Sequence, residues 1–242
     1  MRPVTAPSAV DPLATLGADL KLWLRADVGV TVTGAGVSQW SDQSGNANHA
    51  VQATDANRPI YELSAGKLGV VVDQDRHLTI PDAASLRTAT GKAWGIYAAL
   101  RSSDGGGGNA VIGKWAPTPE WALLYADANT SCKLFVVGSG GTGSIVATVD
   151  CTTGDETICH AKMAVSHNLY VGSLGAWGAA AALSGTPVAS TSVVCVGRHT
   201  VAGGGYGVAD LREIIMYQKT GNITRAEDRA ILAWLRSRWG TP

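Results

Sequence analysis

Short runs of alternating apolar and polar residues dominate the chain. Residues 20–25 read Leu-Lys-Leu-Trp-Leu-Arg, so every second position is a leucine. A period of two places these leucines on one face of a β-strand, which predicts a strand with one buried face. Further apolar runs, separated by glycine-rich or polar turns, occupy residues 69–72, 93–100, 110–113, 121–125, 133–137, 144–149, 161–165, 168–171, 192–196 and 210–217. Short strands without helices between them predict an all-β fold, a sandwich of two antiparallel sheets.

One segment near the C-terminus has helical periodicity instead. Thr224 and Glu227 form a capping box, in which the two side chains accept hydrogen bonds from free backbone N–H groups of the first turn. The apolar side chains that follow share one helical face, namely Ile231, Trp234, Leu235 and Trp239. Gly240 is suited to end the helix. We therefore predict one C-terminal α-helix that packs this face on the sandwich.

The first 17 residues differ in composition from the rest of the chain. They are rich in proline, alanine and serine, which predicts an extended N-terminal arm at 1–17 before one domain at 18–242. A chain of 242 residues is of ordinary length for one β-sandwich. Free termini usually fray unless something holds them. We expect another protein to hold this arm in place.

The charges balance, with 19 lysines and arginines against 19 aspartates and glutamates. A neutral chain without a basic run has no field that attracts nucleic acid or an anionic membrane, so neither is expected as a partner. No apolar stretch reaches the roughly 18 residues that a membrane span needs. Residues 1–8 lack the apolar core of a secretory signal peptide, which predicts synthesis in the cytoplasm and release by lysis.

Two stretches of sequence resemble a known family. The opening stretch comprises residues 22–27, 37–50 and 56–61, and the closing stretch comprises residues 211–217 and the capped helix to Gly240. Together they resemble concanavalin A-like lectin/glucanase domains of the laminin G type from bacterial and phage proteins, over about residues 18 to 240. The resemblance implies a two-sheet antiparallel jelly-roll sandwich. Because this fold hosts lectins, hydrolases and scaffolds, it does not decide the function. Residues 40–48 within the opening stretch suit a buried tryptophan followed by a turn, so we expect a structural role for them.

Catalysis is not expected. Retaining glucanases of the family carry a Glu-x-Asp-x-x-Glu cluster on one strand, and this sequence has none. Asp73, Asp75 and His77 share one strand face and are the alternative catalytic or metal-binding group, although exposed residues at a strand edge explain them better. Residues 138–143 match the dinucleotide fingerprint G-x-G-x-x-G, but an apolar strand pattern follows where that motif needs a helix.

The candidate ligand-binding residues lie in predicted loops. Trp115 follows a strand in a proline-rich loop, and Trp177 lies between glycines. Exposed loop tryptophans mark contact sites, although tryptophan also plugs the ends of sandwiches. Asp104 and Asn109 complete the candidate set.

Calcium is the only cofactor for which the sequence gives any indication. Laminin G-type domains hold Ca²⁺ with oxygen ligands on rim loops, and the matching candidates here are Asp104, Asn109, Asp127 and Asn129. Because no dense Asp-x-Asp-x-Asp loop is present, we predict no metal site and no other cofactor.

The four cysteines lack metal-binding spacing. We expect Cys132, Cys151, Cys159 and Cys195 to be buried free thiols. The alternative is a bridge between Cys151 and Cys159, which flank a predicted hairpin turn.

The sequence thus predicts a non-catalytic surface module. The first hypothesis is a structural or decoration component of a bacteriophage-type virion, held to other virion proteins through the arm at 1–17 and also able to bind glycans. The second is a carbohydrate-binding lectin or adhesion module of a bacterial cell surface. A glycoside hydrolase ranks third, and a homo-oligomer is compatible with each.

Overall fold

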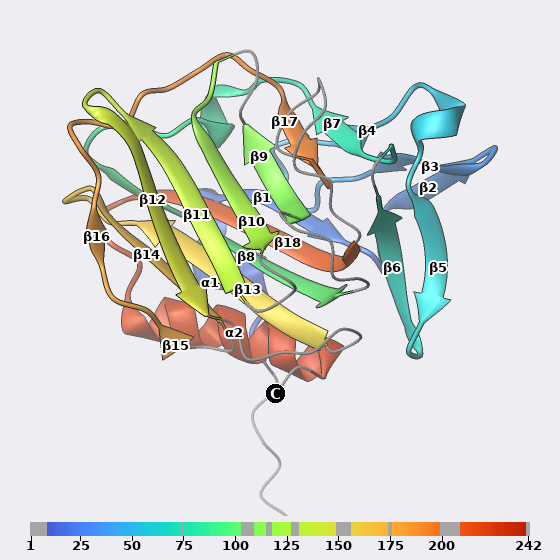
Figure 1. Ribbon diagram of the computed structural model, residues 1–242. Helices are drawn as coiled ribbons and strands as arrows, with labels where there is room; N and C mark the ends of the chain where they lie inside the picture. Colours follow the sequence, from blue (N-terminus) through green and yellow to red (C-terminus); the bar gives the residue numbers. More distant parts are fainter. Residues whose placement is uncertain are drawn as a thin grey trace, which may run out of the picture.

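Two antiparallel sheets stacked face to face form the fold in the computed structural model (Figure 1). The structure describes residues 9–73, 75–102, 109–114, 118–126, 131–148, 156–173, 176–198 and 209–240. Within these ranges each sheet has nine strands. The predicted all-β class, two-sheet antiparallel architecture and C-terminal helix are therefore confirmed.

The first sheet has the strand order β15-β14-β13-β8-β18-β6-β5, with β1 also paired to β18 and β16 to β14. Its strands are β1 (Leu20–Arg25), β5 (Ile60–Ser64), β6 (Lys67–Val72), β8 (Lys92–Ser102), β13 (Glu156–Met163), β14 (Asn168–Ser173), β15 (Ala176–Trp177), β16 (Ala181–Ala182) and β18 (Ala209–Thr220). The long strand β18 lies at the centre of this sheet. It pairs with β8 along one edge and with both β1 and β6 along the other.

The second sheet has the order β12-β11-β10-β9-β17-β7-β4-β3-β2. Its strands are β2 (Val30–Thr33), β3 (Gly36–Trp40), β4 (Ala50–Val51), β7 (Leu78–Ile80), β9 (Asn109–Lys114), β10 (Trp121–Ala126), β11 (Ser131–Gly138), β12 (Gly141–Thr148) and β17 (Val194–Val196). Gly138 pairs with Gly141 at the turn between β11 and β12, so the glycine-rich segment is a hairpin turn, followed by the strand that the apolar pattern predicted and not by a helix.

Five helical segments accompany the sheets in the described part of the chain. They are the α-helices α1 (Pro12–Leu16) and α2 (Arg225–Trp239) and the 3₁₀ turns η1 (Gly17–Asp19), η2 (Asp55–Asn57) and η3 (Ala84–Leu86). The predicted capping box is confirmed, because Thr224 and Glu227 exchange hydrogen bonds at the start of α2. Gly240 ends this helix in the left-handed conformation, with φ of 59°. Within the described residues, no helix is long and apolar enough to span a bilayer.

The hydrophobic core fills the space between the two sheets. Trp94 of the first sheet and Trp121 of the second meet there, with ring centroids 5.0 Å apart. Both rings are fully buried, as is Trp40. This central layer is the packed interior that the alternating strand pattern predicted.

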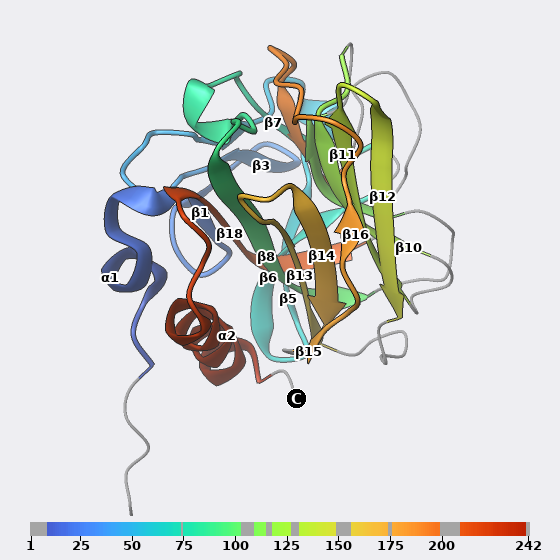
Figure 2. The same ribbon diagram turned by 90° about the vertical axis from the view of Figure 1, so that its left-hand side faces the viewer.

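The outer face of the first sheet is also covered where β1 and β18 lie beneath α2, which the pattern of β1 alone did not reveal. Figure 2 shows α2 on the side of this sheet that faces away from the second sheet. Trp23, on the supposedly polar face of β1, is only 5% exposed because it lies beneath α2. The prediction of a single buried face for residues 20–25 was therefore wrong.

The arm at 1–17 was predicted to be extended, but its described part contains a short helix. Asp11 caps the short helix α1, since its carboxylate accepts a hydrogen bond from the backbone N–H of Ala14 at 2.7 Å. Pro12 occupies the first helical position, where its missing N–H costs nothing. Helix α1 lies against α2 (Figure 2), and its residue Leu16 is buried in the hydrophobic core.

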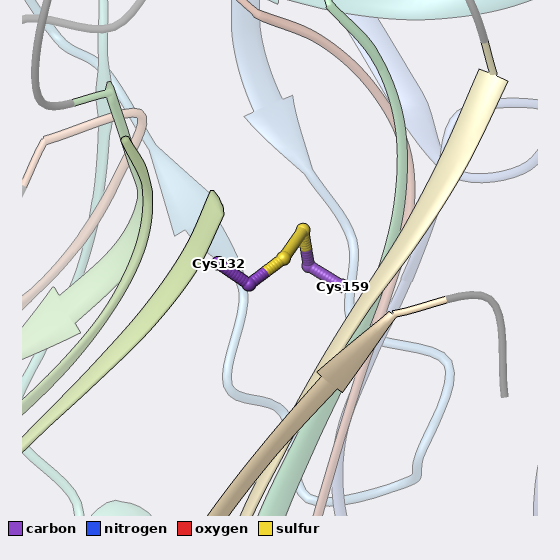
Figure 3. Close-up of a disulfide and its surroundings, with 2 residues drawn as sticks. All are labelled: Cys132 and Cys159. Carbon is purple, nitrogen blue, oxygen red and sulfur yellow. A yellow bond between two sulfur atoms is a disulfide. The ribbon is translucent and has the colours of Figure 1, made fainter. Parts of the chain in front are cut away.

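A disulfide joins the two sheets, which corrects the prediction of four free thiols. Cys132 of β11 and Cys159 of β13 are bonded across the core, with their Cα atoms 6.1 Å apart (Figure 3). Sequence reasoning missed the pair because stacking of the two sheets, rather than a shared hairpin, brings these cysteines together. Cys195 is a buried free thiol as predicted, and Cys151 lies outside the described residues.

Candidate functional site

Of the sequence-predicted ligand-binding residues, Trp177 alone has its side chain within the described structure. Trp115 and Asp104 lie outside the described residues, as do Asp127 and Asn129 among the calcium candidates. Asn109 begins β9, and its side chain is not among those described. The site is therefore built from the surroundings of Trp177.

Trp177 is a strand residue and not the free loop tryptophan of the prediction. It ends β15, and its indole N–H donates a hydrogen bond to Asp228 Oδ2 of α2 at 2.9 Å. The ring of His160 packs edge-on against the indole, with centroids 4.2 Å apart. Tyr170 also packs edge-on, with centroids 6.4 Å apart, and the Lys162 ammonium lies 3.8 Å from the indole centroid. Trp177 is nevertheless only half-buried, so it is both a packing residue and an accessible aromatic surface.

Asp228 fixes this part of the helix to the sheet. It is 8% exposed, and the hydroxyl of Tyr97 on β8 donates to its Oδ1 at 2.6 Å. With the Trp177 indole on Oδ2, both carboxylate oxygens have a donor from the sheet. Burial raises the pKa of Tyr97 well above its ordinary value, and the negative charge of Asp228 acts in the same direction. The phenol therefore stays protonated and remains a donor.

A groove of about 630 Å³ opens between α2 and the edge of the first sheet. Its sheet side carries Lys162 and Trp177, and Figure 1 shows β15 beside the helix. Its helix side is lined by Ile223, Thr224, Arg225, Asp228, Arg229, Leu232, Ala233 and Arg236. We call this cavity the α2 groove. It exists because one helix is narrower than the sheet, so the outer faces of β13 to β15 are left partly uncovered.

A smaller cavity of about 130 Å³ adjoins the α2 groove and shares Lys162 and Ile223 with it. Tyr170 and Tyr217 line this cavity, which we call the tyrosine pocket. The Tyr217 hydroxyl is buried and has no hydrogen-bond partner among the described residues. Burial lowers the pKa of Lys162, and the charge of Asp228 opposes that shift.

A second polar centre holds the C-terminal half of α2 in place. The fully buried carboxylate of Glu213 accepts hydrogen bonds from three indole N–H groups, those of Trp23 at 2.6 Å, Trp234 at 2.8 Å and Trp239 at 2.7 Å. Burial raises the pKa of Glu213, while the three indole bonds and Arg238 act against this. This centre was missed from the sequence, although a glutamate inside the apolar run 210–217 was the available signal. It fixes the helix that forms one wall of the groove.

The acidic residues considered for catalysis lie in a turn, which the side chain of Asp73 stabilises by hydrogen bonds. Asp73 Oδ1 accepts hydrogen bonds from the backbone N–H groups of Asp75 and Arg76, and the Asp73 carboxylate lies 3.5 Å from the Arg76 guanidinium. His77 is buried, and its ring lies 3.4 Å from Arg198. The predicted shared strand face was therefore wrong, because these three residues lie between β6 and β7, and the predicted exposure holds for Asp75 and not for the buried His77. In the described ranges no three His, Cys, Asp or Glu side chains are grouped to hold a metal ion.

The motif at 40–48 is structural, as predicted. Asp42 accepts hydrogen bonds from the backbone N–H groups of Trp23, Ser44 and Asn48 at 2.9 to 3.0 Å. The indole N–H of Trp40 donates to the carbonyl of Arg25 at 2.8 Å. The motif therefore ties β1 to the following turn through side chains that are buried, those of Trp40, Asp42, Ser44 and Asn48.

Comparisons with known proteins identify the fold. No protein-family model matches the sequence, and no curated protein matches it. Among solved structures, the binding domain of Paraclostridial Mosquitocidal Protein 1 is similar with a TM-score of 0.65 and 11% identity, over 93% of this chain and 55% of that one. Trypanosoma rangeli sialidase in complex with sialic acid has a TM-score of 0.62 and 16% identity, over 94% of this chain and 34% of that one.

The binding domain of Botulinum Neurotoxin DC in complex with SialylT has a TM-score of 0.60 and 10% identity, over 91% of this chain and 52% of that one. This chain thus spans about half of the length of each of the two toxin binding domains and about a third of the length of the sialidase. At such identities the likeness concerns the fold. The chain has the β-sandwich architecture that is found within these toxin and sialidase structures.

Proposed function

We propose that the protein is a non-catalytic glycan-binding module and that the α2 groove is its binding site. The observation that carries the proposal is the half-buried indole of Trp177 in a groove lined by charged donors. Sugar rings stack on aromatic faces, and their hydroxyl groups need hydrogen-bond partners at the edge of that face. Trp177 provides the aromatic surface that stays accessible beside the Lys162 ammonium, and Lys162 and the helix arginines provide the donors.

The rigidity of the groove also supports this function. Trp177 and Asp228 join the two walls directly, and Glu213 fixes the rest of the helix through three indoles. A preformed site loses little conformational entropy when a ligand binds. Two of the similar structures are complexes, a sialidase with sialic acid and a toxin binding domain with SialylT. They show that related sandwiches occur in sugar-recognising proteins, which favours a lectin-like role here.

Two variants at one position test the proposal. Trp177→Phe keeps an aromatic face and loses only the bond to Asp228, whereas Trp177→Ala loses both. On a broad glycan array, we expect the wild type and Trp177→Phe to be retained by the same glycans. Trp177→Ala should lower affinity about tenfold or more, which is a change of about 1.4 kcal/mol.

Denaturant unfolding of both variants serves as the control for folding. Both variants lose the Asp228 bond, and Trp177→Ala also loses the packing against His160, so Trp177→Ala should be the less stable of the two. Glycan binding is therefore compared at a temperature at which unfolding shows both variants to be fully folded. Absence of binding by the wild type to every glycan, or equal binding by Trp177→Ala, would refute the proposal. Release of reducing sugar from a bound glycan would refute its non-catalytic part.

The finer predictions from the sequence remain proposals. These are membership of the concanavalin A-like family, decoration of a phage-type virion through the arm at 1–17, and the alternative location at a bacterial cell surface. The Cys132–Cys159 cross-link supports an extracellular working place, since disulfides persist in oxidising surroundings. Co-purification with particles, and its loss on deletion of residues 1–17, tests the virion role.

A further inference from the structure

We propose that the ligand of the α2 groove is an acidic glycan, whose anionic group lies along the helix arginines while a polar substituent enters the tyrosine pocket and bonds the Tyr217 hydroxyl. This inference rests on the proposed function and names its ligand class. It follows from two separate features, the charge of the groove and the hydroxyl of Tyr217, which is unpartnered among the described residues and belongs to a residue that lines the adjoining tyrosine pocket.

The charge of the groove is strongly one-sided although the whole chain is neutral. Lys162, Arg225, Arg229 and Arg236 line it, and Asp228 is its single acidic residue. Arg225 and Arg229 are exposed, and within the described ranges neither forms an ion pair with a carboxylate. Opposite charge attracts a ligand most strongly where a cleft has low-dielectric walls. The groove therefore favours an anion over a neutral sugar.

Asp228 does not cancel this charge for a ligand. Its carboxylate is buried, and its two oxygens are occupied by the Tyr97 hydroxyl and the Trp177 indole. The nearby Glu227 is engaged as well, because it accepts hydrogen bonds from Thr224 and pairs with Lys219 at 2.5 Å. The acidic groups near the start of α2 are thus committed to the fold, while the exposed guanidinium groups of Arg225 and Arg229 form no ion pair within the described ranges.

The spacing of the arginines indicates a ligand longer than one anion. Arg225 and Arg229 are four residues apart on α2, so they lie on one side of the helix and about 6 Å apart along its axis. Lys162 faces them from the sheet, over the indole of Trp177. A sugar that stacks on Trp177 would thus have cationic groups on both sides. A carboxylate or sulfate on that sugar, or on the next sugar of the chain, would pair with Lys162 on the sheet wall or with Arg225 and Arg229 on the helix wall.

The tyrosine pocket provides the second contact. Gly95 of β8 lies opposite Tyr217, and a Cβ atom there would come within 2.4 Å of Tyr217 Cε1. The absence of that methyl group lets the phenol ring occupy its position beside the pocket. A buried hydroxyl without a partner destabilises the protein, and this cost is recovered when a ligand atom accepts its hydrogen bond. A pocket of about 130 Å³ has room for a small substituent such as a hydroxyl or acyl group.

The test compares wild type with three variants on neutral, carboxylated and sulfated oligosaccharides by calorimetry. Arg225→Gln combined with Arg229→Gln removes two charges from exposed positions. Arg76→Gln, in the turn with Asp73, is the matched control for charge removal elsewhere. Tyr217→Phe removes only the unpaired hydroxyl, so we expect unchanged or slightly higher stability together with about tenfold weaker binding.

The outcomes separate this inference from the function on which it rests. Binding to acidic glycans that weakens with salt and falls about tenfold in the double variant, but not in Arg76→Gln, supports it. Equal binding of neutral and acidic glycans refutes the acidic ligand and leaves the glycan-binding function standing. Unchanged affinity of Tyr217→Phe refutes the role of the tyrosine pocket. Binding to no glycan refutes both proposals.

Discussion

Reduction of the Cys132–Cys159 disulfide should lower the stability of the whole domain. The bond joins β11 of one sheet to β13 of the other, so it restricts the unfolded chain between two strands that pair in different sheets. Both cysteines are fully buried in the central layer. Reduction removes the restriction on the unfolded state while leaving the surrounding packing almost unchanged.

The expected size follows from the length of the closed loop. The two cysteines are separated by 27 positions. With the chain-entropy relation, a loop of that length loses about 12 cal/mol/K of unfolded-state entropy, which corresponds to about 3.5 kcal/mol at 25 °C. That is a large share of the 5–15 kcal/mol that stabilises a typical domain. The oxidised protein should therefore unfold at a clearly higher urea concentration.

The assay is urea unfolding, followed by tryptophan fluorescence, with and without a thiol reductant. The double variant Cys132→Ala/Cys159→Ala should be insensitive to reductant, which separates the cross-link from any packing loss caused by the substitutions. Cys195→Ala is the matched control, because Cys195 is a buried free thiol. The free energy of unfolding of Cys195→Ala should fall on reduction by the same amount as that of the wild type.

Reduction should also raise the dependence of unfolding free energy on urea, since the unfolded chain becomes more extended. A reductant-dependent change below about 1 kcal/mol in the wild type would refute the reasoning from loop closure. A full change in the double variant would show that another thiol is responsible.

Two further predictions concern charged groups that are partly or fully buried. The hydrogen bond from Arg87, with a further contribution from Lys114, lowers the pKa of Asp82 from 3.8 to about 2. The ionised carboxylate therefore stabilises the fold above pH 4, and this stabilisation is lost as the pH falls towards 2. Asp82→Asn should remove roughly 2 kcal/mol at pH 7 and flatten the loss of stability between pH 4 and 2, and parallel pH curves for variant and wild type would contradict this. Gly69→Ala should lower the free energy of unfolding by about 3–5 kcal/mol, measured by urea unfolding. The new Cβ atom would lie 1.5 Å from Asp210 Oδ1 and would displace that carboxylate from the buried Arg212. A loss under about 1 kcal/mol would exclude that clash.

The sequence alone determined the elements that depend on neighbouring residues. The alternation at 20–25 and the apolar runs predicted most of the longer strands, and Thr224 with Glu227 predicted the start of α2, because strand patterning and helix capping are settled within a few positions. The more polar strands β2, β3 and β5 were not predicted. The turn at 40–48 and the hairpin at 138–143 were also predicted, since glycine, asparagine and aspartate have local conformational preferences.

The tertiary structure decided what depends on sheet order and stacking. Lys162, Trp177 and Arg229 come from three elements that are distant in sequence, and they meet only because α2 lies on the outer face of the first sheet next to β15. Glu213 acquires its three indole donors, and Cys132 its partner, for the same reason. Local patterns specify which face of a strand is apolar, but which strands become neighbours is fixed by the packing of the whole chain, and the groove is a product of that packing.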